Sequence, residues 1–112
     1  MKPINWDTFN LIDLRVGTVV SAEPFKQARK PAYLLRVDFG PEVGILKSTA
    51  QITVLYDCNS LVGTQVIAVT NLQPKQIGPV QSQCLITGFQ KNDHAVVLAQ
   101  PDRKIPNGMR LS

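Results

Sequence analysis

The chain has 112 residues, with 44% hydrophobic residues, 18% charged residues and a formal net charge of +4. This length and composition predict one folded domain with a single modest core, and they exclude a disordered chain. The basic balance permits a polyanionic partner but does not require one, because many basic domains bind nothing acidic.

No segment of the sequence is suited to a membrane or to export. The opening residues MKPINWDTFN lack the apolar core of a signal peptide, and aliphatic runs such as Ala95–Ala99 are too short to cross a bilayer. Cys58 and Cys84 form no CxxC pair, so we expect reduced thiols and no disulfide. These features predict a soluble, cytoplasmic protein without membrane insertion.

The first residues change from a helical period to a strand period. Trp6, Phe9 and Ile12 recur at helical spacing and predict one short helix over Trp6–Ile12, whose apolar face has to be covered by the barrel or by another subunit. A half-buried strand follows, with a bend or bulge at Gly17. The predicted inner face of this strand consists of Ile12, Leu14, Val16, Val20 and Ala22.

The rest of the chain reads as short strands and one capped turn. After a charged loop over Lys26–Pro31, a second alternating strand contains Tyr33, Leu35, Val37 and Phe39 and ends by turn chemistry at Gly40. Further strands are predicted over Val43–Lys47, Val66–Val69, Cys84–Ile86 and Val96–Leu98, with a helical turn inside Ala50–Leu61 that Asp57 or Asn59 caps.

Five or so short strands, with one helical insertion between the third and the fourth, predict a mainly β fold. The expected architecture is a single OB-fold Greek-key five-stranded barrel over residues 1–112. We expect a short helical N-terminal extension over about 1–12 and a loop-rich C-terminal extension over 100–112, as its proline and glycine content indicates.

The polar connection Asn71–Gly88, which we call the arm, is the most distinctive segment. It joins the apolar strand Val66–Val69 to the strand Cys84–Ile86 and contains Pro74 and Lys75. Such a connection is longer than a tight hairpin needs, and long ordered loops on small barrels commonly meet ligands. The arm is therefore predicted to be a binding element.

The sequence contains no recognisable catalytic or metal site. The single histidine, His94, stands beside Asp93, but a triad needs a nucleophile and an orienting acid that converge on it. Ser82 lies in no nucleophile elbow, and its hydroxyl is better suited to bonding the backbone of the arm. One histidine and two distant cysteines lack the spacing of zinc ligands. We expect no enzyme activity, no metal and no cofactor.

Cations gather in the first long loop and at nearby strand positions. OB barrels commonly bind ligands on the face of their second and third strands, where cations can follow a phosphate backbone. A scattered, solvated surface explains the same residues equally well. The cations concerned are Lys26, Arg29, Lys30, Arg36, Lys47 and Lys75.

Five blocks spread over nearly the whole chain carry a family resemblance. They are LRVGTVVSAE (Leu14–Glu23), AYLLRVDFG (Ala32–Gly40), STAQIT (Ser48–Thr53), the arm, and QPDRKIPNG (Gln100–Gly108). In this order they resemble the CsaA family, small bacterial and archaeal proteins known as secretion chaperones and built on the tRNA-binding OB domain. The same domain is appended to some methionyl-tRNA synthetases and to tRNA-binding cofactors.

The resemblance implies an OB barrel with short terminal extensions that forms a homodimer and has no catalytic activity. It also implies two activities: holding unfolded precursor proteins or peptides for export, and binding tRNA by shape. The candidate tRNA-binding residues are Arg29, Lys30, Arg36, Lys47, Lys75, Gln76 and Ser82. The candidate peptide-binding residues, each of which is equally compatible with a place in the core, are Phe25, Tyr33 and Phe89.

The arm both matches and departs from the family pattern. Pro74, Lys75 and Ser82 match it, whereas Gln76 and Gln81 stand at positions that are often basic in the family. Each lost cation removes roughly one counterion-releasing phosphate contact, which lowers salt-sensitive RNA affinity. The sequence therefore favours an export-related chaperone that keeps a weaker tRNA-binding capacity. The alternative is a structure-specific tRNA-binding protein without a chaperone role.

Overall fold

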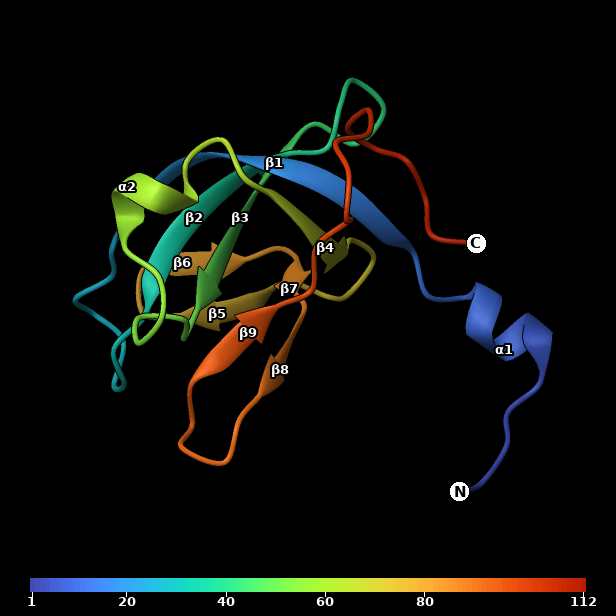
Figure 1. Cartoon of the computed structure of the whole chain (residues 1–112), viewed down its shortest axis with the longest axis horizontal. Coiled ribbons are helices and arrows are strands. Elements are labelled where there is room, and N and C mark those ends of the chain that lie inside the picture. The colour runs from blue at the N-terminus through green and yellow to red at the C-terminus, as the bar shows by residue number, and fades with distance from the viewer.

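The computed structural model describes all 112 residues, and its centre is a five-stranded antiparallel sheet that curls into a nearly closed barrel (Figure 1). The strands lie in the spatial order β3-β2-β1-β4-β7, so that β4 returns to the free side of β1 as in a Greek key. Their bounds are β1 Leu14–Pro24, β2 Tyr33–Asp38, β3 Ile45–Ala50, β4 Gln65–Val69 and β7 Leu85–Ile86. The prediction of a mainly β, OB-like barrel is confirmed.

Two helices and two hairpins complete the fold: α1 (Trp6–Asn10), α2 (Cys58–Leu61), β5 (Lys75–Ile77) with β6 (Val80–Ser82), and β8 (Gly88–Gln90) with β9 (Val96–Leu98). As expected, Asp57 caps α2, since its carboxylate accepts the N–H of Ser60 at 2.7 Å. No helix is long and apolar enough to span a membrane.

Two predicted boundaries were wrong, and three strands were missed: β8, and the pair β5 and β6 within the arm, which the sequence predicts as a long polar loop. The third strand begins at Ile45 rather than Val43, because Gly44 adopts φ +86° in the preceding turn and its carbonyl accepts the N–H of Phe39. The first helix ends at Asn10 rather than at residue 12. The strand β8 was not predicted at all, because its residues are exposed and carry no apolar alternation.

The inner face of β1 switches at a bulge between Val19 and Ser21. Before the bulge, the core side belongs to Gly17 and Val19: a Cβ atom on Gly17 would lie only 2.6 Å from Val37 Cγ1. The extra residue Val20 is 43% exposed, and beyond it Ala22 packs against the core. The predicted inner face of β1 was therefore wrong up to the bulge, including Val20, and right at Ala22. One inserted residue reverses the alternation of side chains between the two faces.

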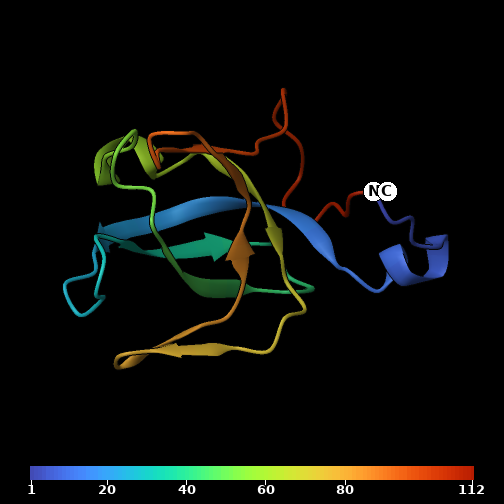
Figure 2. The same ribbon diagram turned by 90° about the horizontal axis from the view of Figure 1, so that it is seen from below.

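Val16 is buried but lies outside the core cluster, and its backbone is bonded to the C-terminal segment. Its N–H donates to the carbonyl of Met109 and its carbonyl accepts the N–H of Gly108. Nearby, the hydroxyl of Thr18 donates to Asn107 Oδ1 at 2.7 Å. The C-terminal segment thus runs back along the first half of β1, with residues 108–111 bonded to the backbone of that strand, in the loop-rich form that the sequence predicts (Figure 2).

The helix α1 stands away from the barrel, and none of its residues is buried (Figures 1 and 2). Asn5 caps it by accepting the N–H of Thr8 at 2.8 Å. Trp6 is 83% exposed, so the apolar face of the helix is not covered by the barrel of the same chain.

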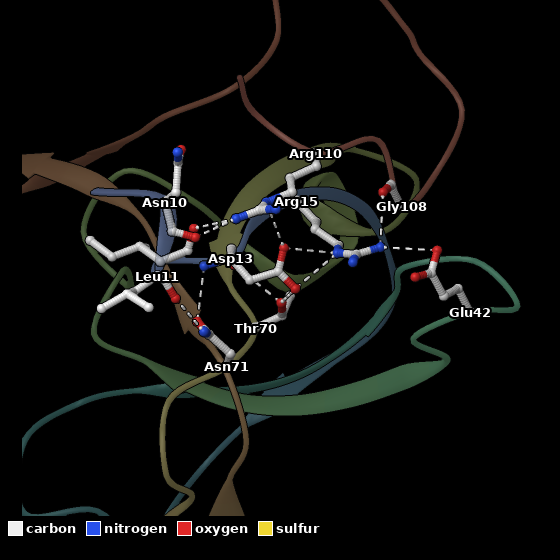
Figure 3. Close-up of polar contacts among 10 residues, drawn as sticks. Asn10, Leu11, Asp13, Arg15, Glu42, Thr70, Asn71, Gly108 and Arg110 are labelled. Atoms are coloured by element: carbon white, nitrogen blue, oxygen red, sulfur yellow. Dashed lines mark hydrogen bonds and ion pairs between the residues drawn. The ribbon is translucent and has the colours of Figure 1, made fainter. Parts of the chain in front are cut away.

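A carboxylate at the start of β1 joins the two ends of the chain (Figure 3). Asp13 accepts hydrogen bonds from Arg15 Nε at 3.0 Å and from the hydroxyl of Thr70 at 3.0 Å, and it forms an ion pair with Arg110 Nε at 3.3 Å. Burial by itself raises the pKa of Asp13, but the bonds from Arg15 and Thr70 and the two positive charges outweigh it and hold the pKa below its usual value.

Backbone carbonyls around α1 are bound by the same region. Arg110 Nη2 donates to the carbonyl of Asn10 at 2.7 Å, and Asn71 Nδ2 donates to the carbonyl of Leu11 at 2.6 Å (Figure 3). Asn71 Oδ1 also accepts the N–H of Asp13 at 2.9 Å. The helix is therefore attached to the barrel through its C-terminal end alone.

We expect Asp13→Asn to lower the free energy of unfolding by about 1–3 kcal/mol near pH 7, because it removes charge-assisted hydrogen bonds. A depressed pKa stabilises the fold above the unfolded-state pKa and loses this effect as pH falls through the folded-state pKa. The difference between wild type and variant should therefore shrink at about pH 3 and below. Urea unfolding at both pH values measures it. Asp7→Asn on the exposed α1 is the control, and an equal difference at both pH values would contradict the role of Asp13.

Candidate nucleic-acid interface

The barrel closes where the arm meets β3, through one backbone hydrogen bond and several that involve side chains. Gln83 forms two hydrogen bonds with the backbone of Lys47. Its side-chain Oε1 accepts the N–H of Lys47 at 2.9 Å, and its backbone N–H donates to the Lys47 carbonyl at 2.8 Å. The buried hydroxyl of Ser48 donates to the carbonyl of Cys84 at 2.9 Å. We call these contacts, with the bond of Ser82 described next, the seam.

Ser82 bonds β3 and not the backbone of the arm. Its Oγ accepts the N–H of Thr49 at 3.1 Å, so the expectation of a bond within the arm was wrong. The register places Ser82 opposite Lys75 in the hairpin. Ser82 therefore fixes the open end of the β5–β6 hairpin, opposite its turn, against β3.

Cys84 is a structural thiol. Burial raises its pKa to about 11, and only a weaker opposing contribution comes from its hydrogen bond with Ser48. Thiolates are the reactive form of cysteine. Cys84 thus stays protonated at neutral pH, and Cys58 is also a free thiol, as expected.

The arm itself is a β-hairpin whose tip meets the loop between β1 and β2. Gly78 has φ +56° in the turn, and Gln76 Nε2 donates to its carbonyl at 2.8 Å. A Cβ atom on Gly78 would lie 3.3 Å from Gln27 Cβ. The hairpin and the β1–β2 loop are therefore neighbours, although 51 positions separate these two residues (78 − 27).

Three of the predicted tRNA-binding residues line one hollow at this junction. Arg29, Lys30 and Gln76 surround an open cavity of about 460 Å³. All three side chains are exposed, and neither cation forms an ion pair with a carboxylate within 4.0 Å. The structure thus brings together residues from the loop and from the arm.

The remaining predicted cations lie outside this hollow. Arg36 and Lys47 are cross-strand partners on β2 and β3, and Lys75 is exposed at the start of β5. Arg36 Nη1 lies 3.8 Å from a carboxylate oxygen of Glu23, an exposed pair that offsets part of its charge. These cations extend the positive surface from the loop onto the β2–β3 face.

The predicted peptide-binding residues do not form one site. Phe25 is 6% exposed, and the hydroxyl of the half-buried Tyr33 donates to the carbonyl of Tyr56 at 2.7 Å. Phe89 is 70% exposed on β8 and pairs with Val97 of β9. Only Phe89 presents most of its ring to solvent.

No catalytic or metal-binding arrangement is formed. His94 Nδ1 lies 3.3 Å from Gln90 Nε2, and the ring forms no hydrogen bond with Ser82 or with a carboxylate. No group of three or more histidine, cysteine or acidic side chains is placed to hold a metal ion. Sequence reasoning did not single out Gln51 or Gln90, which line a neighbouring hollow of about 400 Å³ together with Lys30 and His94. No local pattern marks these residues, because each comes from a different segment.

A family model described as "Putative tRNA binding domain" matches residues 14–110 of this chain. The chain belongs to this tRNA-binding domain family. Similar curated proteins include the methionine–tRNA ligases of Methanothrix thermoacetophila, 40% identical over 108 residues, and of Bacillus anthracis, 37% identical over 110 residues. These matches cover 96% and 98% of the chain but only 15% and 16% of the ligases. The tRNA-binding domain thus spans a small part of such relatives.

Three solved structures are similar to this tRNA-binding domain over their whole length. The chaperone CsaA of Bacillus anthracis is 43% identical with a TM-score of 0.93, and the matching region covers 99% of this chain and 100% of that one. The CsaA chaperone protein of Picrophilus torridus is 39% identical with a TM-score of 0.91, at 98% and 100% coverage. The MetRS related protein of Pyrococcus horikoshii is 29% identical with a TM-score of 0.87, at full coverage of both chains. The resemblance to the CsaA family is confirmed.

We expect Ser82→Ala to lower the free energy of unfolding by about 1–2 kcal/mol, because it leaves the N–H of Thr49 without its partner in the seam. Urea unfolding followed by circular dichroism measures this loss. Gln81→Ala, on the same strand and without a hydrogen bond to β3, is the control, for which we expect a change within about 0.5 kcal/mol. Equal unfolding midpoints for Ser82→Ala and wild type would show that the seam does not depend on this hydroxyl.

Proposed function

We propose that this chain is a non-catalytic, cytoplasmic CsaA-like protein that binds tRNA and holds unfolded precursor proteins. The observation that carries the tRNA part is the position of two cations without a carboxylate partner, Arg29 and Lys30, beside the arm. The chain also matches a tRNA-binding domain model over residues 14–110. In this proposal residues 1–112 act as one domain, with 1–12 and 100–112 as its extensions.

Phosphate contacts by exposed cations supply most of the affinity in sequence-independent binding to nucleic acid. The loop cations have no carboxylate partner, so their positive potential faces solvent. Lys75 and the β2–β3 pair, Arg36 and Lys47, lengthen this surface. Such a surface suits the backbone of a folded RNA and binds it by shape rather than by sequence.

A chaperone role is the second part of the proposal. It is supported by the 43% identity to the chaperone CsaA of Bacillus anthracis over nearly the whole chain. It is also supported by the exposed apolar side chains around α1, where Ile4, Trp6 and Phe9 line a shallow hollow of about 250 Å³. Exposed apolar patches commonly mark interaction surfaces.

We propose that α1 forms part of a homodimer contact. The helix is not covered by its own barrel, and a second copy would bury Trp6, which is 83% exposed. Two copies would also present two peptide-binding surfaces and gain avidity for one long unfolded chain. Among the candidate peptide contacts, the exposed Phe89 is best placed to meet a client.

Binding to tRNA should weaken steeply as salt rises, and Arg29→Ala should make the plot of log affinity against log salt shallower by about one unit, because one phosphate contact is lost. Fluorescence anisotropy of labelled tRNA from about 50 to about 200 mM salt measures both slopes. Lys104→Ala, on the C-terminal segment away from the arm, is the control with the same charge loss. Salt-independent binding, or an equal slope change in the control, would contradict the proposed interface.

The protein at micromolar concentration should suppress the aggregation of a chemically unfolded client, as measured by light scattering. Trp6→Glu should dissociate the homodimer in analytical ultracentrifugation and weaken suppression, because it places a charge on the proposed contact. Val54→Glu, which places the same charge on another exposed apolar position, is the control. Absence of suppression by the wild type argues against the chaperone role, and a monomeric wild type argues against the dimer.

A further inference from the structure

Two neighbouring hollows share part of their lining, and one of them borders the arm. One is the cavity of about 460 Å³ between the β1–β2 loop and the β5–β6 hairpin, and the other is the cavity of about 400 Å³ next to the β8–β9 turn. Lys30 and Gln51 line both of them. The β1–β2 loop, the β5–β6 hairpin and the β8–β9 turn lie on the side of the barrel away from α1 (Figure 1). We call this surface the amide trough, because it contains the glutamines Gln27, Gln51, Gln76 and Gln90.

The trough is positively charged and has no acidic lining. Arg29 and Lys30 lie in it, and none of the eight aspartate and glutamate residues of the chain lines either hollow. A groove lined by one sign of charge concentrates the opposite charge from solution. The ligand that fits this electrostatic environment is a polyanion.

The glutamine side chains have unused hydrogen-bonding groups. A carboxamide carries one acceptor oxygen and two N–H donors side by side. Gln76 uses one N–H on the carbonyl of Gly78, whereas the exposed side chains of Gln27 and Gln51 bind no other group of the protein. Donors and acceptors in this spacing match the open edges of nucleobases.

An exposed aromatic ring, that of His94, lines the hollow next to the β8–β9 turn. His94 has φ +68°, the only positive φ among non-glycine residues, which is an unfavourable conformation for a residue with a side chain. The turn supports it, since the N–H of His94 donates to the carbonyl of Lys91, and Asp93 Oδ1 accepts the N–H of Ala95 at 3.1 Å. Its ring lies beside Gln90. Unpaired RNA bases stack on rings of this kind.

These groups suit an unpaired strand better than a helix. In an A-form duplex the base edges are paired, and the deep, narrow major groove is closed to side chains. A single strand can instead lay its phosphates along the cations and turn its bases toward the amides and the ring. We propose that the amide trough binds a single-stranded RNA segment, with Arg29 and Lys30 on phosphates and with Gln51, Gln90 and His94 on bases. This inference rests on the proposed RNA binding and names the part of the RNA that the arm contacts.

The test compares a labelled single-stranded RNA of about ten nucleotides and mixed sequence with a blunt duplex of the same length, by fluorescence anisotropy. We expect tighter binding of the single strand. The double variant Gln51→Ala/His94→Ala should weaken that binding by about tenfold through the loss of base contacts. The control Asn59→Ala/Lys104→Ala, at exposed positions outside the trough, should leave it unchanged. Urea midpoints establish that both variants fold.

Three results would overturn the inference: equal or tighter duplex binding, an unchanged affinity in the trough variant, or an acidic peptide that displaces the RNA and loses its own binding in that variant. A parallel titration with tRNA separates the two proposals. Binding of tRNA without binding of the single strand overturns the single-strand inference alone. Absence of both overturns the proposed RNA-binding function as well.

Discussion

The seam between β3 and the arm determines where the whole candidate interface lies. The edge strands β3 and β7 share no ladder, and the barrel closes instead through a few individual bonds. Gln83 bonds Lys47 through both its backbone N–H and its side chain, and Ser48 donates to the carbonyl of Cys84. Because these bonds fix the base of the β5–β6 hairpin, its tip comes to rest against the β1–β2 loop at Gln27. The loop cations and the arm therefore become neighbours only once the barrel has closed.

The bulge in β1 affects the side of the barrel that lies away from the seam. Because of the extra residue, Val19 before the bulge and Ala22 after it both face the core. The C-terminal segment bonds to the backbone of β1 ahead of the bulge, and its Arg110 reaches Asp13 and the end of α1. The two chain ends are thus held together away from the trough, which leaves one side for nucleic acid and another for the apolar helix.

This separation is compatible with the two kinds of partner proposed above, RNA and unfolded protein. The cations and amides lie beside the arm, and the exposed apolar side chains around Trp6 lie at the far end. In the arm, the carboxamide of Gln76 offers hydrogen bonding of defined geometry and no long-range attraction to phosphate. The trough accordingly combines few charges with many amides, a balance that favours contacts with exposed bases over attraction to any polyanion.

The sequence by itself determined the barrel, the cap at Asp57 and the family, because strand alternation, helix caps and short blocks of family-like residues are local signals. Val37 and Phe39 lie in the core, as their spacing predicts. Only the tertiary structure decided the inner face of β1, the partner of Ser82 and the gathering of Gln51 and His94 beside Lys30. The physical reason is that a bulge, a seam and a trough depend on contacts between residues far apart in the chain, and these contacts leave no periodic trace in either partner.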